Sequence, residues 1–285
     1  MKKLLFPVFA LVLLSSCGGN KAEEGAEKDT ADTVADSVAF LPVDKEDSIM
    51  AQTKVPKAAD GVFYDFISSF CQNSSYQKSR IKFPLECDFN GQKRVIKAKD
   101  WHFSKLYYNS DMYTVFFPDV DAIKLETDES VDNVNVLWYN TTSSTVSSYS
   151  FEKQNGQWWL MRIDERDITD DEDNGFINFY AHFAADAHFR ATHLAEMLIY
   201  DGVDPESEDE FEDNMVKEKR SPSSHWSETL IPELSCEQFS NIDFGQDLSG
   251  SERVVSVESP STGFSSRLHF RKEADGWQLY KIENL

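Results

Sequence analysis

Phenylalanines recur at helical spacing in two separate stretches of the chain. Residues 63–70 read FYDFISSF and residues 176–183 read FINFYAHF, with phenylalanine at the first, fourth and eighth place of both. Apolar positions at i, i+3, i+4 and i+7 form one face of an amphipathic helix. Each stretch therefore predicts a helix, with start signals at Asp60 and at Asn174 followed by Gly175.

The alignment of the two stretches continues downstream at an unchanged offset. It pairs Tyr76 with Phe189, Ile81 with Leu194, and Leu85 with Leu198. We therefore expect a second helix after a short break in each half.

The chain also repeats a hairpin pattern towards the end of each half. Residues 151–163 and 270–282 are identical at five of thirteen positions without a gap. Each has an Asn-Gly or Asp-Gly turn followed by Trp, Leu and Ile, spaced for a strand. The segments 134–139 and 253–258 align at the same offset and predict a further strand in each half.

Other segments differ between the halves. Asn90 and Gly91 predict a turn that joins strands at 85–89 and 94–99. The second half instead has the acidic run 204–213, after which we expect an inserted helix at 215–220.

Helices followed by antiparallel strands indicate the α+β class. We expect two tandem domains at 59–168 and 169–285, each with helices packed on a curved antiparallel sheet. The order of elements, together with terminal strands that read GQWWL and GWQL, resembles the nuclear-transport-factor-2-like fold. The chain as a whole resembles an uncharacterised family of gut-bacterial lipoproteins with tandem domains of this fold. A cystatin-like module is the nearest structural alternative.

The amino terminus has the pattern of a lipoprotein signal peptide. Lys2 and Lys3 precede an apolar stretch, 4–14, that is too short to span a bilayer. The sequence Leu-Ser-Ser-Cys that ends at Cys17 resembles a lipobox, which implies cleavage after residue 16 and a lipid on Cys17. We therefore expect an outer-membrane lipoprotein of a Gram-negative envelope, either periplasmic or surface-exposed, that is held to the membrane by this lipid.

Residues 17–58 are acidic and nearly free of aromatic side chains, which predicts a disordered tether. Four segments of this tether resemble an O-glycosylation sequon in which Asp precedes Ser or Thr and a small apolar residue. The candidate acceptors are Thr30, Thr33, Ser37 and Ser48.

Charge narrows the classes of ligand and partner. The formal net charge is −22, and such acidity argues against nucleic-acid binding. We expect no cofactor, because the chain lacks a glycine-rich phosphate loop and a Gly-x-Ser-x-Gly elbow.

The cysteines and histidines give no metal motif. Cys71 and Cys87 form the one cysteine pair within a single predicted domain, and the sequence does not decide whether they form a disulfide. On a helix, His182, His188 and His193 would point in different directions, so we expect no metal site.

Aromatic and polar side chains cluster in the first half, where they form a candidate ligand site. Its members are His102, Tyr107, Tyr108, Tyr113, Trp138 and Tyr139. No acid–base pair of the superfamily's enzymes can be placed on this sequence, so we assign no catalytic residue. We therefore expect a non-catalytic module that binds a protein, a small molecule or a glycan. The alternative is an isomerase or hydrolase that uses a pocket of the first domain.

Overall fold

The computed structural model describes residues 59–204, 215–222 and 230–285, which lie within one compact unit, Phe40–Leu285. The predicted signal peptide, the candidate lipidation site Cys17, the predicted tether and the four candidate glycosylation sites lie outside the described residues. Within the described parts of the chain, no helix has the length and apolarity needed to cross a membrane.

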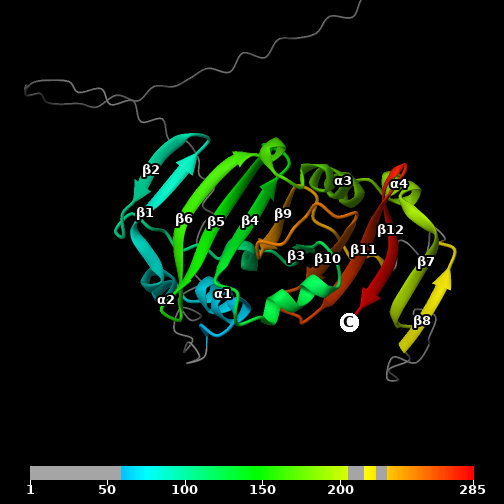
Figure 1. Ribbon diagram of the computed structural model, residues 1–285, viewed down its shortest axis with the longest axis horizontal. Helices are drawn as coiled ribbons and strands as arrows, with labels where there is room; N and C mark the ends of the chain where they lie inside the picture. The colour runs from blue at the N-terminus through cyan, green and yellow to red at the C-terminus, as the bar shows by residue number, and fades with distance from the viewer. Residues whose placement is uncertain (1–58, 205–214, 223–229) are drawn as a thin grey trace, which may run out of the picture. The chain divides into compact units, whose positions relative to one another are not determined.

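The first half begins with two helices and continues mainly as strands (Figure 1). Its elements are α1 (Phe63–Gln72), α2 (Ser74–Ser79), β1 (Ile81–Phe89), β2 (Gln92–Ile96), the 3-10 helix η3 (Leu106–Asn109), β3 (Tyr113–Phe117), the 3-10 helix η4 (Asp121–Thr127), β4 (Asn133–Asn140), β5 (Thr145–Gln154) and β6 (Gln157–Asp167).

The second half repeats this order. Its elements are the 3-10 helix η5 (Ile168–Asp170), α3 (Asn174–Ala185), α4 (Ala187–Thr192), β7 (Leu194–Val203), β8 (Met215–Arg220), β9 (Gln238–Asp243), β10 (Glu252–Glu258), β11 (Ser265–Glu273) and β12 (Gly276–Asn284). The predicted α+β class, with helices on largely antiparallel sheets, is confirmed.

The two six-stranded sheets exchange one strand each. Sheet A has the order β2-β1-β6-β5-β4-β9, and sheet B has the order β3-β10-β11-β12-β7-β8 (Figure 1). Strand β9 of the second half therefore lies at the edge of sheet A, and strand β3 of the first half lies at the edge of sheet B. Neither sheet is built from one half of the chain alone. The division into domains at 168/169 stays a prediction.

The strand registers repeat between the sheets. Tyr139 pairs with Phe239 where β4 meets β9, and Glu258 pairs with Tyr113 where β10 meets β3. The parallel pairs match as well: Ile81 of β1 lies opposite Leu160 of β6, and Leu194 of β7 lies opposite Leu279 of β12.

The two exchanged strands are joined to each other by hydrogen bonds at Thr114 and Ser240, both of which are buried. The Thr114 amide donates to Ser240 Oγ at 3.1 Å, and Ser240 Oγ donates to the Thr114 carbonyl at 2.9 Å. Thr114 Oγ1 donates to the Ser240 carbonyl in return. Two residues further along β3, the Phe116 amide donates to Asn241 Oδ1 at 2.7 Å.

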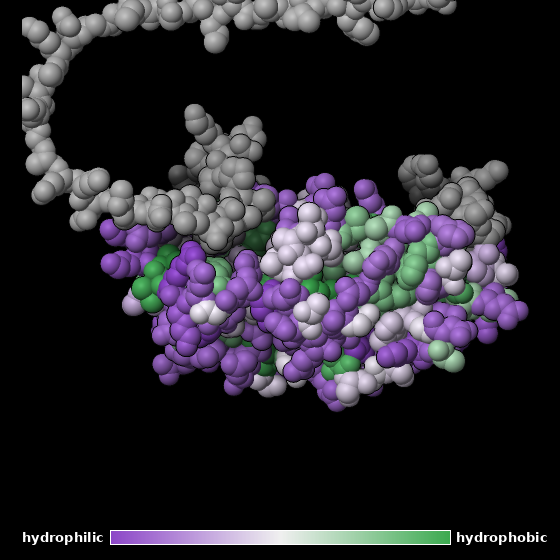
Figure 2. Space-filling view, turned by 90° about the horizontal axis from the view of Figure 1, so that it is seen from above, coloured by the Kyte–Doolittle hydropathy of each residue, from purple (hydrophilic) through white to green (hydrophobic). Residues whose placement is uncertain are grey.

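Aromatic rings fill the space between the helices and the sheets. In the first half the ring of Phe63 lies 5.0 Å from that of Trp158, and Phe70 lies 5.3 Å from Phe151. In the second half Phe176 lies 4.9 Å from Trp277. The predicted phenylalanine faces of α1 and α3 are buried, which confirms both helices. Outside these cores, hydrophilic residues cover most of the face seen in Figure 2.

The predicted second helix is present in each half, but it is shorter than the alignment implied and one other predicted element is wrong. Helix α2 ends at Ser79 and α4 ends at Thr192, and Ile81 and Leu194 begin strands β1 and β7. Residues 215–220 form strand β8, which pairs with β7 at the edge of sheet B, instead of an inserted helix. The hairpin at Asn90 and Gly91 is confirmed, with β2 over residues 92–96.

The described cysteines are free thiols. Cys71 and Cys87 are buried in the first core, and Cys236 is partly exposed. The disulfide between Cys71 and Cys87, which the sequence left undecided, is therefore not formed in this structure.

Substitutions at the contact between β3 and β9 should reduce stability. Ser240→Ala leaves the buried amide and carbonyl of Thr114 without their partner, so we expect a loss of about 1–3 kcal/mol in the free energy of unfolding. Thr114→Val should cost about 1 kcal/mol, and the double variant should depart from additivity by at least ~0.5 kcal/mol. Urea unfolding of the four proteins measures these values.

The matched control is Ser143→Ala, which removes an exposed hydroxyl whose partner is the hydroxyl of Thr145 in the same turn. It should change stability by less than about 0.5 kcal/mol. A Ser240→Ala variant as stable as this control would contradict the importance of the contact.

Candidate functional site

Three of the six predicted site residues lie together beside β3. The ring of Tyr107, on η3, lies 4.7 Å from that of Tyr113 and 5.1 Å from that of Tyr108. Tyr107 is fully buried, and its hydroxyl has no hydrogen-bond partner among the residues that the structure describes. Burial raises the pKa of both Tyr107 and Tyr108, and that of Tyr108 reaches about 12.

A carboxylate from the other half of the chain joins these tyrosines. Glu258, at the end of β10, accepts hydrogen bonds of 2.5 Å at Oε2 from the hydroxyls of Tyr113 and Tyr64. Burial raises the pKa of Tyr64, and the negative charge of Glu258 raises it further. The strand exchange therefore creates a cluster that neither half contains alone.

A second carboxylate, Glu126 of η4, lies close enough to Glu258 to interact with it. Burial raises the pKa of Glu126 to about 7, the charge of Glu258 contributes to the increase, and the charge of Arg267 opposes it. Glu126 Oε1 is buried and finds no hydrogen-bond partner in the described parts of the chain. Glu126, Glu258 and Tyr64 were not predicted as site residues, because their association depends on pairing between the halves.

The remaining predicted residues do not join this cluster. Tyr139 is buried in the second core and stacks on Phe239 at 5.2 Å. Trp138 lies on the opposite face of β4, half-buried against the first core. His102 is exposed on the chain between β2 and η3.

A polar recess of about 440 Å³ lies against the face of sheet A that carries Tyr139. Its floor is a row of neighbours across β5, β4 and β9: Ser148, Leu137 and Asn241. The complete lining is Asn135, Leu137, Tyr139, Ser148, Arg166, Asp170, Asp171, Glu172, Asn241, Asp243, Gly245, Gln246 and Leu248.

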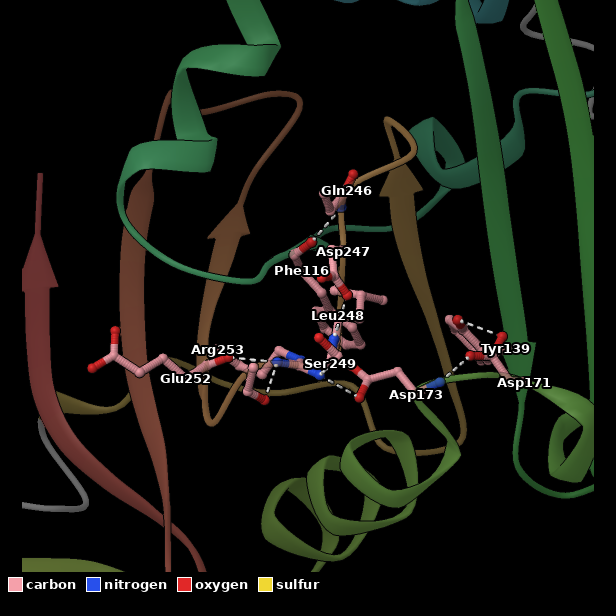
Figure 3. A network of polar contacts seen from close by, with 11 residues as sticks. Phe116, Tyr139, Asp171, Asp173, Gln246, Asp247, Leu248, Ser249, Glu252 and Arg253 are labelled. Carbon is pink, nitrogen blue, oxygen red and sulfur yellow. Dashed lines mark hydrogen bonds and ion pairs between the residues drawn. The ribbon is translucent and has the colours of Figure 1, made fainter.

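One end of the recess is built around Asp171. Its Oδ2 accepts a hydrogen bond of 3.1 Å from the Tyr139 hydroxyl and one of 3.0 Å from Arg166 Nη2. Its Oδ1 accepts from the Asp173 amide at 3.0 Å. Figure 3 shows the Tyr139 and Asp171 side chains directed towards each other beside α3. These bonds fix the position of the carboxylate.

The opposite end is formed by Asp243 and the connection between β9 and β10. Asp243 accepts from Asn135 Nδ2 at 3.3 Å and from the Gly245 amide at 2.8 Å. Gln246 donates to the Phe116 carbonyl at 3.0 Å, which ties this connection to β3 (Figure 3).

Two polar groups on the floor face the recess without a partner. Asn241 is 2% exposed and Ser148 is 6% exposed, and both line the recess. Asn241 Oδ1 accepts from the Phe116 amide, so the Asn241 Nδ2 donor is left for the recess. Neither this Nδ2 nor the Ser148 hydroxyl has a hydrogen bond among the described residues. Both atoms belong to residues that line the recess, so a ligand or water there can bond to them.

A buried ion pair supports the recess from behind. Arg253 of β10 is 2% exposed and donates to Asp173 with Nε at 2.8 Å and with Nη2 at 2.7 Å. The same guanidinium donates to the carbonyls of Leu248, Gly250 and Glu252. Figure 3 shows Arg253 between Asp173 and the chain that follows β9. Arg253 therefore holds the chain that follows β9 against the start of α3.

The recess and the Glu258 cluster occupy corresponding places in the two halves. The matched registers make Tyr139 the counterpart of Glu258, and Phe239 the counterpart of Tyr113. Beside Glu258, the connection 118–132 carries η4 and brings in Glu126. Beside Tyr139, the connection 244–251 is shorter and contains no helix, and the recess lies there.

The described residues do not offer a metal centre: no three His, Cys, Asp or Glu side chains among them are grouped to hold an ion. His182 instead contacts the Asn178 carbonyl, and His193 contacts the Phe189 carbonyl.

Comparison with known proteins places the chain in a family. Residues 42–284 match the family described as a domain of unknown function, DUF4348, and the chain belongs to that family. It is also similar to an NTF2-like protein from Bacteroides fragilis, known from a crystal structure. The two are 29% identical with a TM-score of 0.70, over 80% of this chain and 98% of that one. The expected NTF2-like fold is thereby supported. The comparison with curated proteins finds no match.

Glu126 should make stability depend on pH. The folded protein holds the Glu126 proton up to about pH 7, whereas the unfolded chain releases it near its ordinary pKa of 4.5. The contribution of protonated Glu126 to the free energy of unfolding is therefore complete below pH ~4.5, and it is lost as the pH rises towards ~7. Glu126→Gln keeps a neutral side chain, so by pH ~8 it should be more stable than the native protein by on the order of 1–3 kcal/mol.

Thermal or urea unfolding between pH ~5 and ~8 checks this. The control is Glu129→Gln, an exposed glutamate of the same connection, which should follow the native protein. Parallel stability curves for Glu126→Gln and the native protein would show that Glu126 does not titrate in this range.

Proposed function

We propose that the protein is a lipid-anchored, non-catalytic binding module of the cell envelope, formed by two NTF2-like halves, and that it holds a small polar ligand in the recess on sheet A. The observation that carries this proposal is the placement of polar and apolar groups on the two faces of that sheet. The side of sheet A that faces α1 is filled with aromatic rings, and the polar recess lies on the opposite side, near the start of α3.

The filled interior argues against catalysis between the helices and the sheets. Enzymes of this fold superfamily use an acid or base inside a cone at that place. Here Phe66, Phe151 and Trp158 occupy it in the first half, and Phe179 and Phe270 occupy it in the second. The centroids of neighbouring rings in these two groups lie 5.7–6.2 Å apart, so a substrate would have to displace the core itself.

The recess has the composition of a binding site. Ligand sites combine a concave shape with a few placed polar groups, and a volume of about 440 Å³ lies within their usual range. Asp171 and Asp243 are held at its ends by hydrogen bonds, and the free donors on its floor are already in position. The ligand would meet a site that needs little rearrangement.

The envelope location rests on the sequence. The lipobox at Cys17 supplies the anchor, and residues 17–58 supply a tether between the lipid and the folded part. Several acyl chains hold a protein on a bilayer far more firmly than one. The candidate glycosylation sites at Thr30, Thr33, Ser37 and Ser48 fall on this tether, where modification would not disturb the core.

A second candidate function is the isomerase or hydrolase already considered. Glu126 favours it, since a carboxyl group with a pKa of about 7 suits general acid–base catalysis. However, neither Glu126 nor Glu258 lines the recesses around Asp119, Asn135, Cys236 or Asn90. Binding is therefore the stronger proposal.

Cys17→Ser should release the protein from the membrane. Without the thiol no lipid can be attached, so we expect the variant in the soluble fraction and the native protein in the outer membrane. Cys236→Ser, which removes a partly exposed thiol far along the sequence, is the control and should remain in the membrane. Cell fractionation measures both. A Cys17→Ser protein that stays in the membrane fraction would disprove the anchor. Separately, protease treatment of intact cells reports which leaflet the native protein faces.

Small polar probes should bind in the recess. Amide NMR titrations of the full chain carrying Cys17→Ser, with glucose as a polar probe and indole as an apolar one, locate binding. Glucose should shift the amides of residues 241–248, and Ser148→Ala should weaken the effect. Ser147→Ala, on the opposite face of β5, is the matched control and should not. If indole shifts the amides around the aromatic interior and glucose shifts none of the amides around the recess, the alternative function is favoured.

A further inference from the structure

We infer that the recess on sheet A takes an amino sugar: a ligand of about one hydroxyl-rich ring that carries a positive charge. This inference rests on the proposed binding function and names the class of ligand. Three features of the recess support it: its size, the hydrogen-bonding character of its floor, and the sign of the charge on its walls.

The size limits the ligand to a small one. About 440 Å³ is towards the low end of small-molecule sites. The recess is closed at one end by Tyr139 and Asp171 and at the other by Asp243 and Gly245. A single ring fits between these ends, whereas an extended chain would have to leave the recess at its open side.

The floor requires hydroxyl groups. Asn241 Nδ2 needs an acceptor, because the Phe116 amide fixes the opposite end of that side chain. Ser148 Oγ can accept or donate, and the carboxylate of Asp243, which already accepts from Asn135 and Gly245, can accept a further hydrogen bond. A hydroxyl group accepts and donates at once, so neighbouring hydroxyls on one ring satisfy all three. An apolar ligand would bury these groups without partners.

The walls favour a positive charge. The recess is lined by four carboxylates, Asp170, Asp171, Glu172 and Asp243, against the single guanidinium of Arg166. That guanidinium is already paired with Asp171 at 3.0 Å. An ammonium group gains from the excess of negative charge, and a carboxylate group on the same ring is repelled.

The other half of the chain supplies a comparison. At the corresponding place on sheet B, η4 packs beside α1 and brings Glu126 towards Glu258 and Arg267. The chain itself thus covers that position. On sheet A the shorter connection 244–251 leaves the floor groups without a protein partner, and a ligand can reach them.

Three sugars that differ in charge test the inference on the full chain carrying Cys17→Ser, which keeps it soluble. The probes are glucosamine, glucose and glucuronate at pH ~6.5, where the amine is mostly protonated, and calorimetry or NMR titration measures each Kd. Glucosamine should bind most tightly, with a Kd at least about tenfold below that of glucuronate. Equal or tighter binding of glucuronate would overturn the inference.

Variants separate charge from shape. Asp243→Asn keeps the hydrogen-bonding oxygen and removes a charge, so the preference for glucosamine over glucose should fall about threefold or more. Ser148→Ala should raise the Kd of all three sugars to a similar extent, and Ser147→Ala should raise the Kd of none of them. An unchanged preference in Asp243→Asn would also count against the inference.

The two levels of the proposal can fail separately. If glucuronate binds best and its shifts still fall on residues 241–248, the recess is a ligand site and the amino-sugar assignment is wrong. If none of the three sugars shifts those residues, both the assignment and the proposed site are wrong. Thermal unfolding of each variant confirms that loss of binding is not loss of the fold.

Discussion

The contact between β3 and β9 is the constraint on which the rest of the molecule depends. Where the two exchanged strands meet, Thr114 and Ser240 bond to each other through backbone and side chain, in a place that water does not reach. Buried backbone groups must find partners, and here each strand supplies them for the other. The contact fixes both strands relative to each other, and with them the edges of both sheets. The Glu258 cluster and the recess are each built next to one of the exchanged strands.

Local patterns made much of the fold predictable. The phenylalanine stripes identified α1 and α3, and the Gly-containing turns identified the hairpins, because both signals depend on residues close in sequence. The errors arose where the pattern was short. Ile81 and Leu85 have the spacing of a helix as well as of a strand, although Pro84 between them argues for the strand. Residues 215–220 have helix-forming side chains, and their pairing with β7 decides the outcome.

The sites were less predictable than the fold, for a related reason. Tyr107, Tyr108 and Tyr113 are close in sequence and lie together in space. Glu258 reaches them from almost the other end of the chain, through a strand pairing that no local pattern encodes. The floor of the recess is harder still: Ser148 and Asn241 are ordinary strand residues in the sequence. Their importance lies in what surrounds them, since one is left without a partner and the other has only half of its amide bonded.

The exchange of strands also imposes an order of events on a chain that emerges amino terminus first. When the first half has been synthesised, β4 has no neighbour at its outer edge and β3 has no sheet to join, because both partners lie between residues 238 and 258. An unpaired edge is a template for association with other chains. Completion of either sheet therefore waits until nearly the whole chain is present. The strands between residues 238 and 258 close the architecture that the first half of the chain begins, so neither sheet is complete until they have been synthesised.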